Sequence, residues 1–200
     1  MADESRVIAA NEYRRERWKN GTGWTREIAR VPDYPDWDWR LSIAEIEKDG
    51  PFSSFPGFDR ELVLIRGNGL RLRFDQGEVR ALLPPHDRIR FAGERVVQGE
   101  LIDGLTHDFN LIWRRNAVTA ELLHRPLVGP MLFFTEPGVT WAIHLLAGQA
   151  AFDQASGLPP MWTGDTAILM DSEKRGRYAL EGGGEVLAIK LQRPQQAPGQ

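Results

Sequence analysis

Two arginines, Arg40 and Arg60, are the residues of this sequence best suited to chemistry with a small acidic molecule. In residues 37–44 apolar and polar side chains alternate, so Arg40, Ser42 and Ala44 are expected on one face of a strand. Small side chains leave space beside the arginine, and a planar guanidinium can bind a carboxylate through two hydrogen bonds. A strand surface that simply faces solvent would show the same pattern, and this alternative stays open.

An internal repeat divides the sequence into two alike halves. Three pairs of segments recur in the same order at an offset of about 80 residues: 61–67 with 142–148, 86–91 with 164–169, and 108–114 with 187–193. Each half reads as an apolar strand, a glycine turn, a strand, a loop, an aspartate-led strand and a closing apolar strand. That order is typical of cupin barrels, and the second half resembles a cupin.

The two halves differ at positions that the repeat makes equivalent. Arg60 falls opposite Trp141, while Asp108 and Asn110 fall opposite Leu187 and Ile189. A buried polar group without a partner costs about 1–3 kcal/mol. Several of them on one wall of the first half therefore indicate a hydrated cavity or a ligand site. A structural ion pair between Arg60 and Asp108 is the alternative explanation.

The chain as a whole is expected to be all-β. Its 200 residues include 42% hydrophobic and 26% charged side chains, an ordinary balance for a globular protein. Strand-like runs outnumber helix-like ones, and glycine or proline interrupts the chain at short intervals. The best helical stretch is residues 9–18. We therefore predict a bicupin, with two fused cupin-like β-barrel or jelly-roll halves and few short helices.

The repeat places the boundary between the halves near residue 115. Residues 1–115 would form an N-terminal half with the ligand cavity, 116–193 a mainly structural C-terminal half, and 194–200 a disordered tail. Cysteine, an apolar leader and apolar runs of membrane-spanning length are all missing, so we expect a cytoplasmic protein with no membrane partner. The net charge of −3 disfavours nucleic acid as a partner. An exposed sheet edge could pair two copies in a homodimer.

The four histidines give no recognisable metal-ligand spacing. No two of His86, His107, His124 and His144 lie within four residues of each other, whereas metal ligands must converge within bonding distance. The segment 20–23 lacks the Lys-Ser/Thr ending of a phosphate loop, and the sequence has no nucleophile elbow. We predict no metal, no cofactor and no catalytic residue; a site assembled across strands stays open as an alternative.

Several longer motifs in the first half resemble one family. They comprise residues 18–28, 38–45, 49–53, 55–60, 103–104 and 108–115. These motifs are similar to those of the HutD/Ves family of bacterial bicupin proteins. One departure is Thr22, where the family usually has a third consecutive glycine, and threonine would strain a turn that needs positive φ. The resemblance implies a bicupin without an obligatory metal, linked to histidine utilisation or environmental stress.

The resemblance also implies further site residues, since Thr25 and Arg26 belong to the family's motifs. Together with the residues named above, they give this predicted ligand-binding set: Asn20, Thr25, Arg26, Arg40, Ser42, Arg60, Asp108 and Asn110. We expect the partner to be a small acidic or polar metabolite that is bound rather than converted. The resemblance implies that it is an acidic intermediate of histidine breakdown, such as urocanate, formiminoglutamate or formate, which the protein would sense or buffer.

Two other functions stay open at this point. A carboxylate in a closed pocket (Glu27, Glu45 or Asp108) could have a raised pKa and act as the general base of an isomerase or hydrolase. A structural or partner-binding protein would need neither a cavity nor a base.

Overall fold

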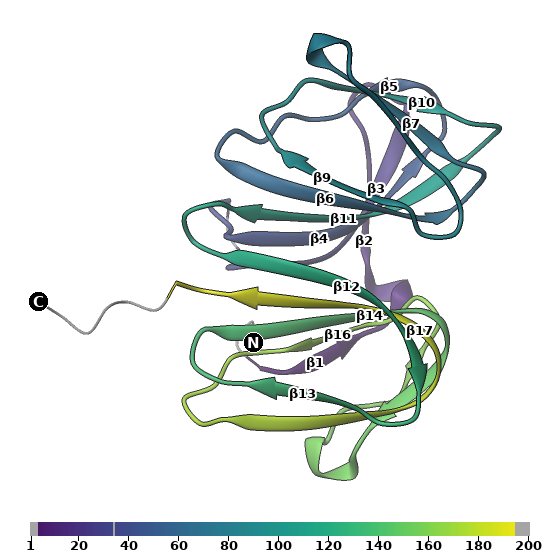
Figure 1. Cartoon of the computed structure of the whole chain (residues 1–200). Helices are drawn as coiled ribbons and strands as arrows, with labels where there is room; N and C mark the ends of the chain where they lie inside the picture. Colours follow the sequence, from purple (N-terminus) through teal and green to yellow (C-terminus); the bar gives the residue numbers. More distant parts are fainter. Residues whose placement is uncertain (1–3, 34, 195–200) are drawn as a thin grey trace, which may run out of the picture. The chain divides into compact units, whose positions relative to one another are not determined.

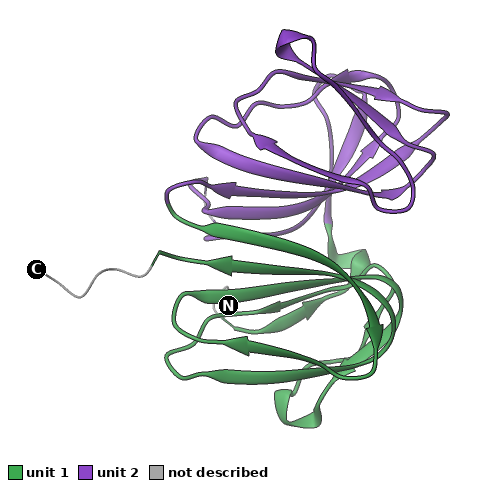
Figure 2. Cartoon of the chain, in the orientation of Figure 1, with its two compact units in different colours: residues 1–13, 117–200 green, residues 14–116 purple. Residues whose placement is uncertain are grey.

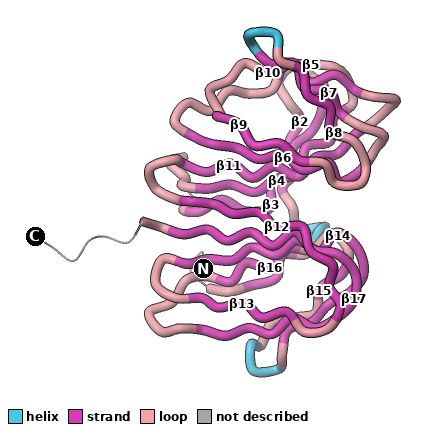
Figure 3. The backbone as a smooth tube through the Cα atoms, viewed as in Figure 1, coloured by secondary structure: helices cyan, strands magenta, loops and turns pink. Residues whose placement is uncertain are grey.

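The computed structural model describes residues 4–33 and 35–194, which fold mainly as antiparallel strands (Figure 1). The chain forms two compact units: unit 1 comprises residues 1–13 and 117–200, and unit 2 comprises residues 14–116 (Figure 2). Among residues 4–33 and 35–194, helical structure is confined to short 3₁₀ turns (Figure 3). Within the described ranges no helix is long and apolar enough to cross a membrane. The predicted all-β fold class is confirmed.

Unit 2 consists of two antiparallel sheets. Its strands are β2 (Arg14–Arg17), β3 (Gly23–Val31), β4 (Trp39–Ile46), β5 (Gly50–Pro51), β6 (Phe58–Arg66), β7 (Leu70–Phe74), β8 (Val79–Leu82), β9 (Arg88–Ala92), β10 (Val97–Leu101) and β11 (Thr106–Arg114), with the 3₁₀ turn η2 (Asp75–Gly77) between β7 and β8. One sheet has the order β2-β3-β4-β11-β6-β9, and the other has the order β5-β10-β7-β8.

The apolar core of unit 2 lies between these two sheets. Leu62 and Leu64 of β6 pack in one cluster with Leu70 and Leu72 of β7. Residues two apart on a strand share a face, so the alternating sequence of β7 delivers its leucines to this core and its arginines to solvent. The core thereby fixes which face of the larger sheet points inward.

Unit 1 contains a single described sheet. Its elements are β1 (Arg6–Ile8), η1 (Ala10–Glu12), β12 (Thr119–Val128), β13 (Met131–Thr135), β14 (Val139–Phe152), η3 (Gln154–Ser156), β15 (Met161–Trp162), β16 (Thr166–Leu169) and β17 (Gly176–Gln192). The order is β1-β16-β14-β17-β12, with β13 paired to β17 and β15 paired to β14. The long strands β14 and β17 run side by side through the unit (Figure 1), and their inward residues form an apolar cluster.

The strand pairing supports the internal repeat. In unit 2 the three repeated segments form the neighbouring strands β11, β6 and β9, in that order across the sheet. In unit 1 their counterparts form the neighbouring strands β17, β14 and β16, in the same order. The offset of the last segment was wrong by one residue, however. Leu62 pairs with Asn110 on the core face of unit 2, as Ile143 pairs with Ala188 in unit 1. The core-facing counterparts are therefore Val186 for Asp108 and Ala188 for Asn110, in place of Leu187 and Ile189.

The predicted helix over residues 9–18 is wrong. The segment contains only the 3₁₀ turn η1, followed by β2, whose residues 14–17 pair with residues 24–27 of β3. The polar side chains that resembled a helix surface belong to an exposed edge strand.

The first residues of the chain group with its second half. Arg6–Ile8 form β1, which pairs with β16, so residues 1–13 belong to unit 1. Of the predicted tail at 194–200, residues 195–200 lie outside the described residues.

Candidate functional site

A cavity of about 490 Å³ lies on the core-facing side of the larger sheet of unit 2. Its wall is formed by residues of β2, β3, β4, β6 and β11 together with the segments 18–20 and 51–55. The structure places six of the eight predicted ligand-binding residues in this wall: Asn20, Thr25, Arg40, Ser42, Arg60 and Asn110. That they bind a ligand stays a prediction.

Strand register brings these side chains onto one face. Ser42 of β4 is paired with Asn110 of β11 on one side and with Glu27 of β3 on the other. Directly paired residues project to the same side of a sheet. Because sides alternate along a strand, Arg40 joins Ser42, and Thr25 joins Glu27. The predicted alternation is therefore present over residues 39–44 of β4, whereas Trp37 precedes the strand and its ring centre lies 5.3 Å from the guanidinium carbon of Arg40.

Arg26 and Asp108 are not part of the cavity wall. Arg26 lies between Thr25 and Glu27 on β3 and projects to the opposite face, where its guanidinium is 3.8 Å from a carboxylate oxygen of Glu45. Asp108 shares the inward face with Asn110 but is completely buried, in register with Ala44.

Arg60 is the most deeply buried cation of the site, with 3% of its surface exposed. One terminal nitrogen donates a hydrogen bond to the Ser53 carbonyl oxygen at 3.3 Å. The guanidinium carbon lies 5.1, 5.7 and 5.2 Å from the ring centres of Phe52, Phe55 and Phe91, an arrangement in which aromatic faces partly replace water. Burial lowers the pKa of Arg60 to about 10, so the side chain remains a cation at neutral pH.

Arg40 is a second cation of the wall and is partly buried. Its guanidinium carbon lies 5.3 Å from the ring centres of both Trp37 and Phe55. Burial lowers the pKa of Arg40, and the carboxylate of Glu27 partly opposes that effect. Phe55 thus faces both arginines and separates them from solvent on one side.

Four inward side chains carry buried polar atoms that lack a hydrogen-bond partner within the described part of the chain. They are the Nε atoms of Arg40 and Arg60, Oδ1 of Asn110, and both carboxylate oxygens of Asp108. Asp108 therefore forms no hydrogen-bonded ion pair with Arg60, which was the alternative explanation of the sequence pattern. Burial raises the pKa of Asp108 to about 7, although Arg60 acts in the opposite direction.

The phenylalanine side chains of the wall were not predicted as site residues. Phe52 and Phe55 come from the loop after β5, and Trp18 precedes the turn into β3. Space for the Phe52 ring depends on Gly99 of β10, since a Cβ atom there would lie only 2.5 Å from it. Both phenylalanines lie within the motifs that resemble the HutD/Ves family, and this resemblance was the only feature of the sequence that could have indicated a role in the site.

The charged residues of the wall are mostly basic. They comprise Arg14, Arg17, Lys19, Arg40 and Arg60 against Glu16 and Glu27. A concave surface with this excess of positive charge attracts anions and repels metal cations.

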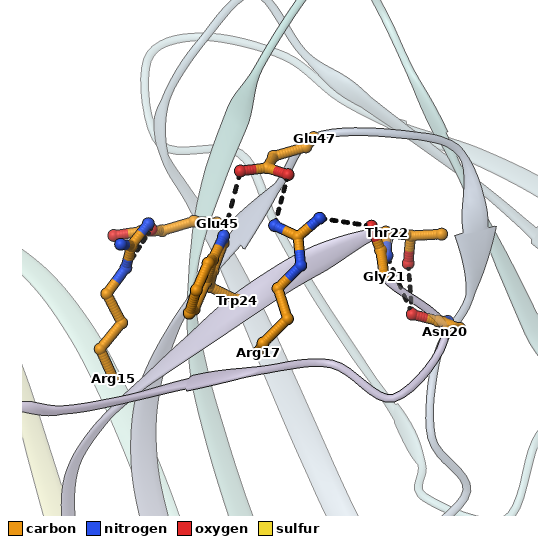
Figure 4. Close-up of polar contacts among 8 residues, drawn as sticks. All are labelled: Arg15, Arg17, Asn20, Gly21, Thr22, Trp24, Glu45 and Glu47. Atoms are coloured by element: carbon orange, nitrogen blue, oxygen red, sulfur yellow. Dashed lines mark hydrogen bonds and ion pairs between the residues drawn. The ribbon is translucent and has the colours of Figure 1, made fainter.

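The turn at the edge of the cavity is held by side-chain contacts (Figure 4). Oδ1 of Asn20 accepts hydrogen bonds from the Thr22 backbone nitrogen at 3.1 Å and from the Thr22 hydroxyl at 2.8 Å. The positive φ falls on Gly21, at 69°, and not on Thr22. The strain expected from threonine in place of glycine is therefore absent.

Arg17 ties this turn to the end of β4. It binds Glu47 at 2.6 Å and donates to the Gly21 carbonyl oxygen at 2.7 Å. Trp24 donates to Glu47 at 3.1 Å and lies between the guanidinium groups of Arg15 and Arg17, on the sheet face opposite Thr25 (Figure 4). Trp24 therefore supports the turn from outside the cavity, whereas Trp18 lines it.

Replacing Asn20 with alanine is expected to lower the free energy of unfolding by about 1 kcal/mol, because two donors of Thr22 lose their acceptor. Urea unfolding of the full chain measures this difference. The matched control is Asn20→Asp, which keeps an oxygen acceptor at that position and should retain most of the stability. Equal stability of Asn20→Ala and the wild type would contradict the proposed role of the turn.

The fold and the site define a class of protein, a bicupin of jelly-roll type with a polar cavity in one unit. Distant solved structures share this fold, such as the bacterial pirin YhhW from Escherichia coli in complex with nickel(II), with 10% identity and a TM-score of 0.66 over 95% of this chain and 99% of that chain. At such low identity the likeness concerns the fold alone.

Within this class the chain belongs to the HutD family, whose sequence model matches residues 10–188. The solved structure of HutD from Pseudomonas fluorescens SBW25 (formate condition) is 30% identical, with a TM-score of 0.82 over 95% of this chain and 99% of that chain. The resemblance to the HutD/Ves family is thereby confirmed.

Curated relatives match over a shorter stretch. An uncharacterized 21.2 kDa protein in the hutC 3′ region of Pseudomonas putida is 42% identical over 118 residues, which is 58% of this chain and 62% of the relative. Protein Ves from Cronobacter sakazakii is 41% identical over 106 residues, which is 52% of this chain and 58% of the relative. The matches thus span less than two thirds of these relatives.

Proposed function

We propose that unit 2 binds a small carboxylate in its cavity without a metal and without converting it. The observation that carries this proposal is the set of buried polar atoms without partners on Arg40, Arg60 and Asn110, all in one cavity wall. A buried donor without an acceptor is costly, and a carboxylate would accept from both guanidinium groups in charge-assisted hydrogen bonds. Asn110 would meet a donor group of the ligand through its unpartnered Oδ1.

The proposal includes a biological role, the sensing or buffering of an acidic intermediate of histidine breakdown. Urocanate, formiminoglutamate and formate are the candidates, since each is a small carboxylate. The family name HutD and the hutC-region relative support this role.

The positions of the three carboxylates that could act as a general base favour binding over catalysis. Glu27 lines the cavity, but it is held 4.0 Å from Arg14 and 3.7 Å from Arg30. Glu45 lies on the opposite face of the sheet, 2.6 Å from Arg15. Asp108 is buried outside the cavity wall. Each is a poor candidate for removing a proton from a bound substrate.

The test is an NMR titration of the isotope-labelled full chain with formate, urocanate and formiminoglutamate. Carboxylates should shift the amide signals of β4, β6 and β11, and added salt should weaken the binding. Formamide, which matches formate in size but carries no charge, is the control ligand and should not compete. If none of the three acids causes shifts in these strands, the proposed function is wrong; depletion of an acid by the purified protein would instead indicate an enzyme.

A further inference from the structure

Asp108 is a carboxyl group that the proposed binding function does not use directly. It is completely buried, and neither of its oxygens has a partner in the described chain. It lies two residues from Asn110 on the inward face of β11 and pairs with Ala44, and both of these residues line the cavity. Asp108 therefore lies on the same face of the sheet as the cavity, next to two residues of its wall.

Arg60 connects Asp108 to the cavity. Its side chain lines the cavity, and its charge acts on Asp108. Among the described residues no carboxylate lies within hydrogen-bond distance of its guanidinium, which donates to the backbone carbonyl oxygen of Ser53. A bound anion and the carboxylate of Asp108 would thus compete for the same positive charge.

The other groups around Asp108 leave this competition undisturbed. Across the core, β7 presents the apolar Leu70 and Leu72. On the larger sheet, Arg40 of β4 acts on Arg60 and is itself influenced by Glu27 of β3 and Glu16 of β2.

Two other ionisable groups lie near Asp108 along the strands but on the opposite face. His107 pairs with Glu45 there, and burial lowers its pKa. Glu61 of β6 lies 3.5 Å from Arg88, and burial raises its pKa. His107 is the one that needs a control, because an imidazole ordinarily titrates near neutral pH.

We propose that Asp108 is a positioning residue that balances the charge of Arg60 in the empty cavity, and that binding of an anion is coupled to uptake of one proton by Asp108. This inference rests on the proposed function. The bound anion and ionised Asp108 would repel each other at low dielectric constant, so the carboxylate takes a proton from solvent and becomes a neutral carboxylic acid. By linkage, anions then bind more tightly when Asp108 is already protonated.

The pKa of Asp108 supports the coupling in the physiological range. Burial has already raised that pKa to about 7 in the empty site. A neighbouring anion raises it further, because a like charge disfavours the ionised form. The protonation state therefore changes on binding at neutral pH.

The experiment titrates the full chain with formate at about pH 6 and about pH 8, a range in which formate itself stays ionised. We expect the wild-type Kd to be about fivefold higher at pH 8, as follows from a rise of about one unit in the pKa of Asp108 on binding. Asp108→Asn mimics the neutral acid, so its Kd should differ less than twofold between the two pH values. His107→Gln is the control and should keep the wild-type pH dependence.

Calorimetry adds a measurement that needs no substitution. Titration of the wild type in two buffers with different ionisation enthalpies should show a net uptake of part of one proton near pH 7. Zero uptake, a wild-type Kd that does not change with pH, or an unchanged pH dependence in Asp108→Asn would each overturn the coupling while leaving the proposed binding intact. If neither formate nor urocanate nor formiminoglutamate binds at either pH value, the proposed function is refuted, and the coupling with it.

Discussion

Replacing Arg60 with methionine is expected to weaken carboxylate binding by about 30-fold or more. Loss of a buried charge-assisted contact costs about 2–5 kcal/mol, and each 1.4 kcal/mol corresponds to about a tenfold change in Kd. Arg60 should contribute strongly because it is 3% exposed and its Nε lacks a partner in the described structure. Titration with formate and urocanate measures the loss.

The fold should survive this substitution. Methionine retains much of the apolar contact with Phe52, Phe55 and Phe91, and an incompletely satisfied buried cation is often a net cost to the empty protein. We expect an unchanged or higher Tm at pH 6. Arg71→Met, which removes an exposed arginine paired with Glu100 on the smaller sheet, is the matched control and should bind normally. Binding by Arg60→Met within threefold of the wild type would remove Arg60 from the site.

The second large effect concerns stability and the proton of Asp108. The pKa of this carboxyl is raised from 3.8 to about 7 in the folded protein, so the native state holds the proton more tightly than the unfolded state does. The resulting stabilisation is complete below about pH 4 and is lost progressively as pH rises to about 7. Since one pKa unit corresponds to about 1.4 kcal/mol, the loss amounts to about 4 kcal/mol.

Asp108→Asn should remove this pH dependence. The amide resembles the protonated acid, so the variant should match the wild type near pH 4 and exceed its free energy of unfolding by about 2–4 kcal/mol at pH 8. Urea unfolding across this range measures the difference. Glu121→Gln, on an exposed part of β12, controls for the loss of a negative charge. Parallel stability profiles for Asp108→Asn and the wild type would show that Asp108 does not carry the proton.

The inward position of Arg40 and Ser42 follows from the sequence by a simple physical rule. Side chains alternate between the two faces of a strand, and residues 37–44 alternate between bulky apolar and smaller or polar residues. The same rule shows that Thr25 and Arg26 cannot both line one cavity when they lie on one regular strand. Arg26 entered the predicted set through motif likeness alone, and the structure places it on the other face.

The counterparts of Asp108 and Asn110 in the repeat were decided only by strand register. Residues 186–189 of β17 are all buried, and so are residues 108–113 of β11. A strand buried on both faces shows no alternation, so its sequence does not reveal which residues point inward. A shift of one residue in the strand register moves every side chain of the strand to the other face of the sheet. The first half still carries polar residues where the second half carries apolar ones, because the corrected counterparts Val186 and Ala188 are apolar, as Leu187 and Ile189 are.

The segment at 9–18 shows how tertiary pairing overrides local pattern. Its charged residues give no apolar stripe, and an isolated polar segment of this length has little preference for any structure. Pairing with β3 supplies the hydrogen bonds that make residues 14–17 a strand. The aromatic wall depends likewise on a loop, since Phe52 reaches the cavity only because Gly99 leaves room for it.

The sequence by itself determined the all-β bicupin fold, the HutD/Ves resemblance, and the concentration of polar inward residues in the first half, because periodicity, repeats and motifs are local properties of the chain. Tertiary structure decided that six of the eight predicted residues share one cavity, that Arg26 faces away, and that Asp108 is buried next to the wall and does not line it. Depth, hydrogen-bond partners and pKa depend on which side chains and how much water surround a group. Those surroundings exist only once distant strands have packed together.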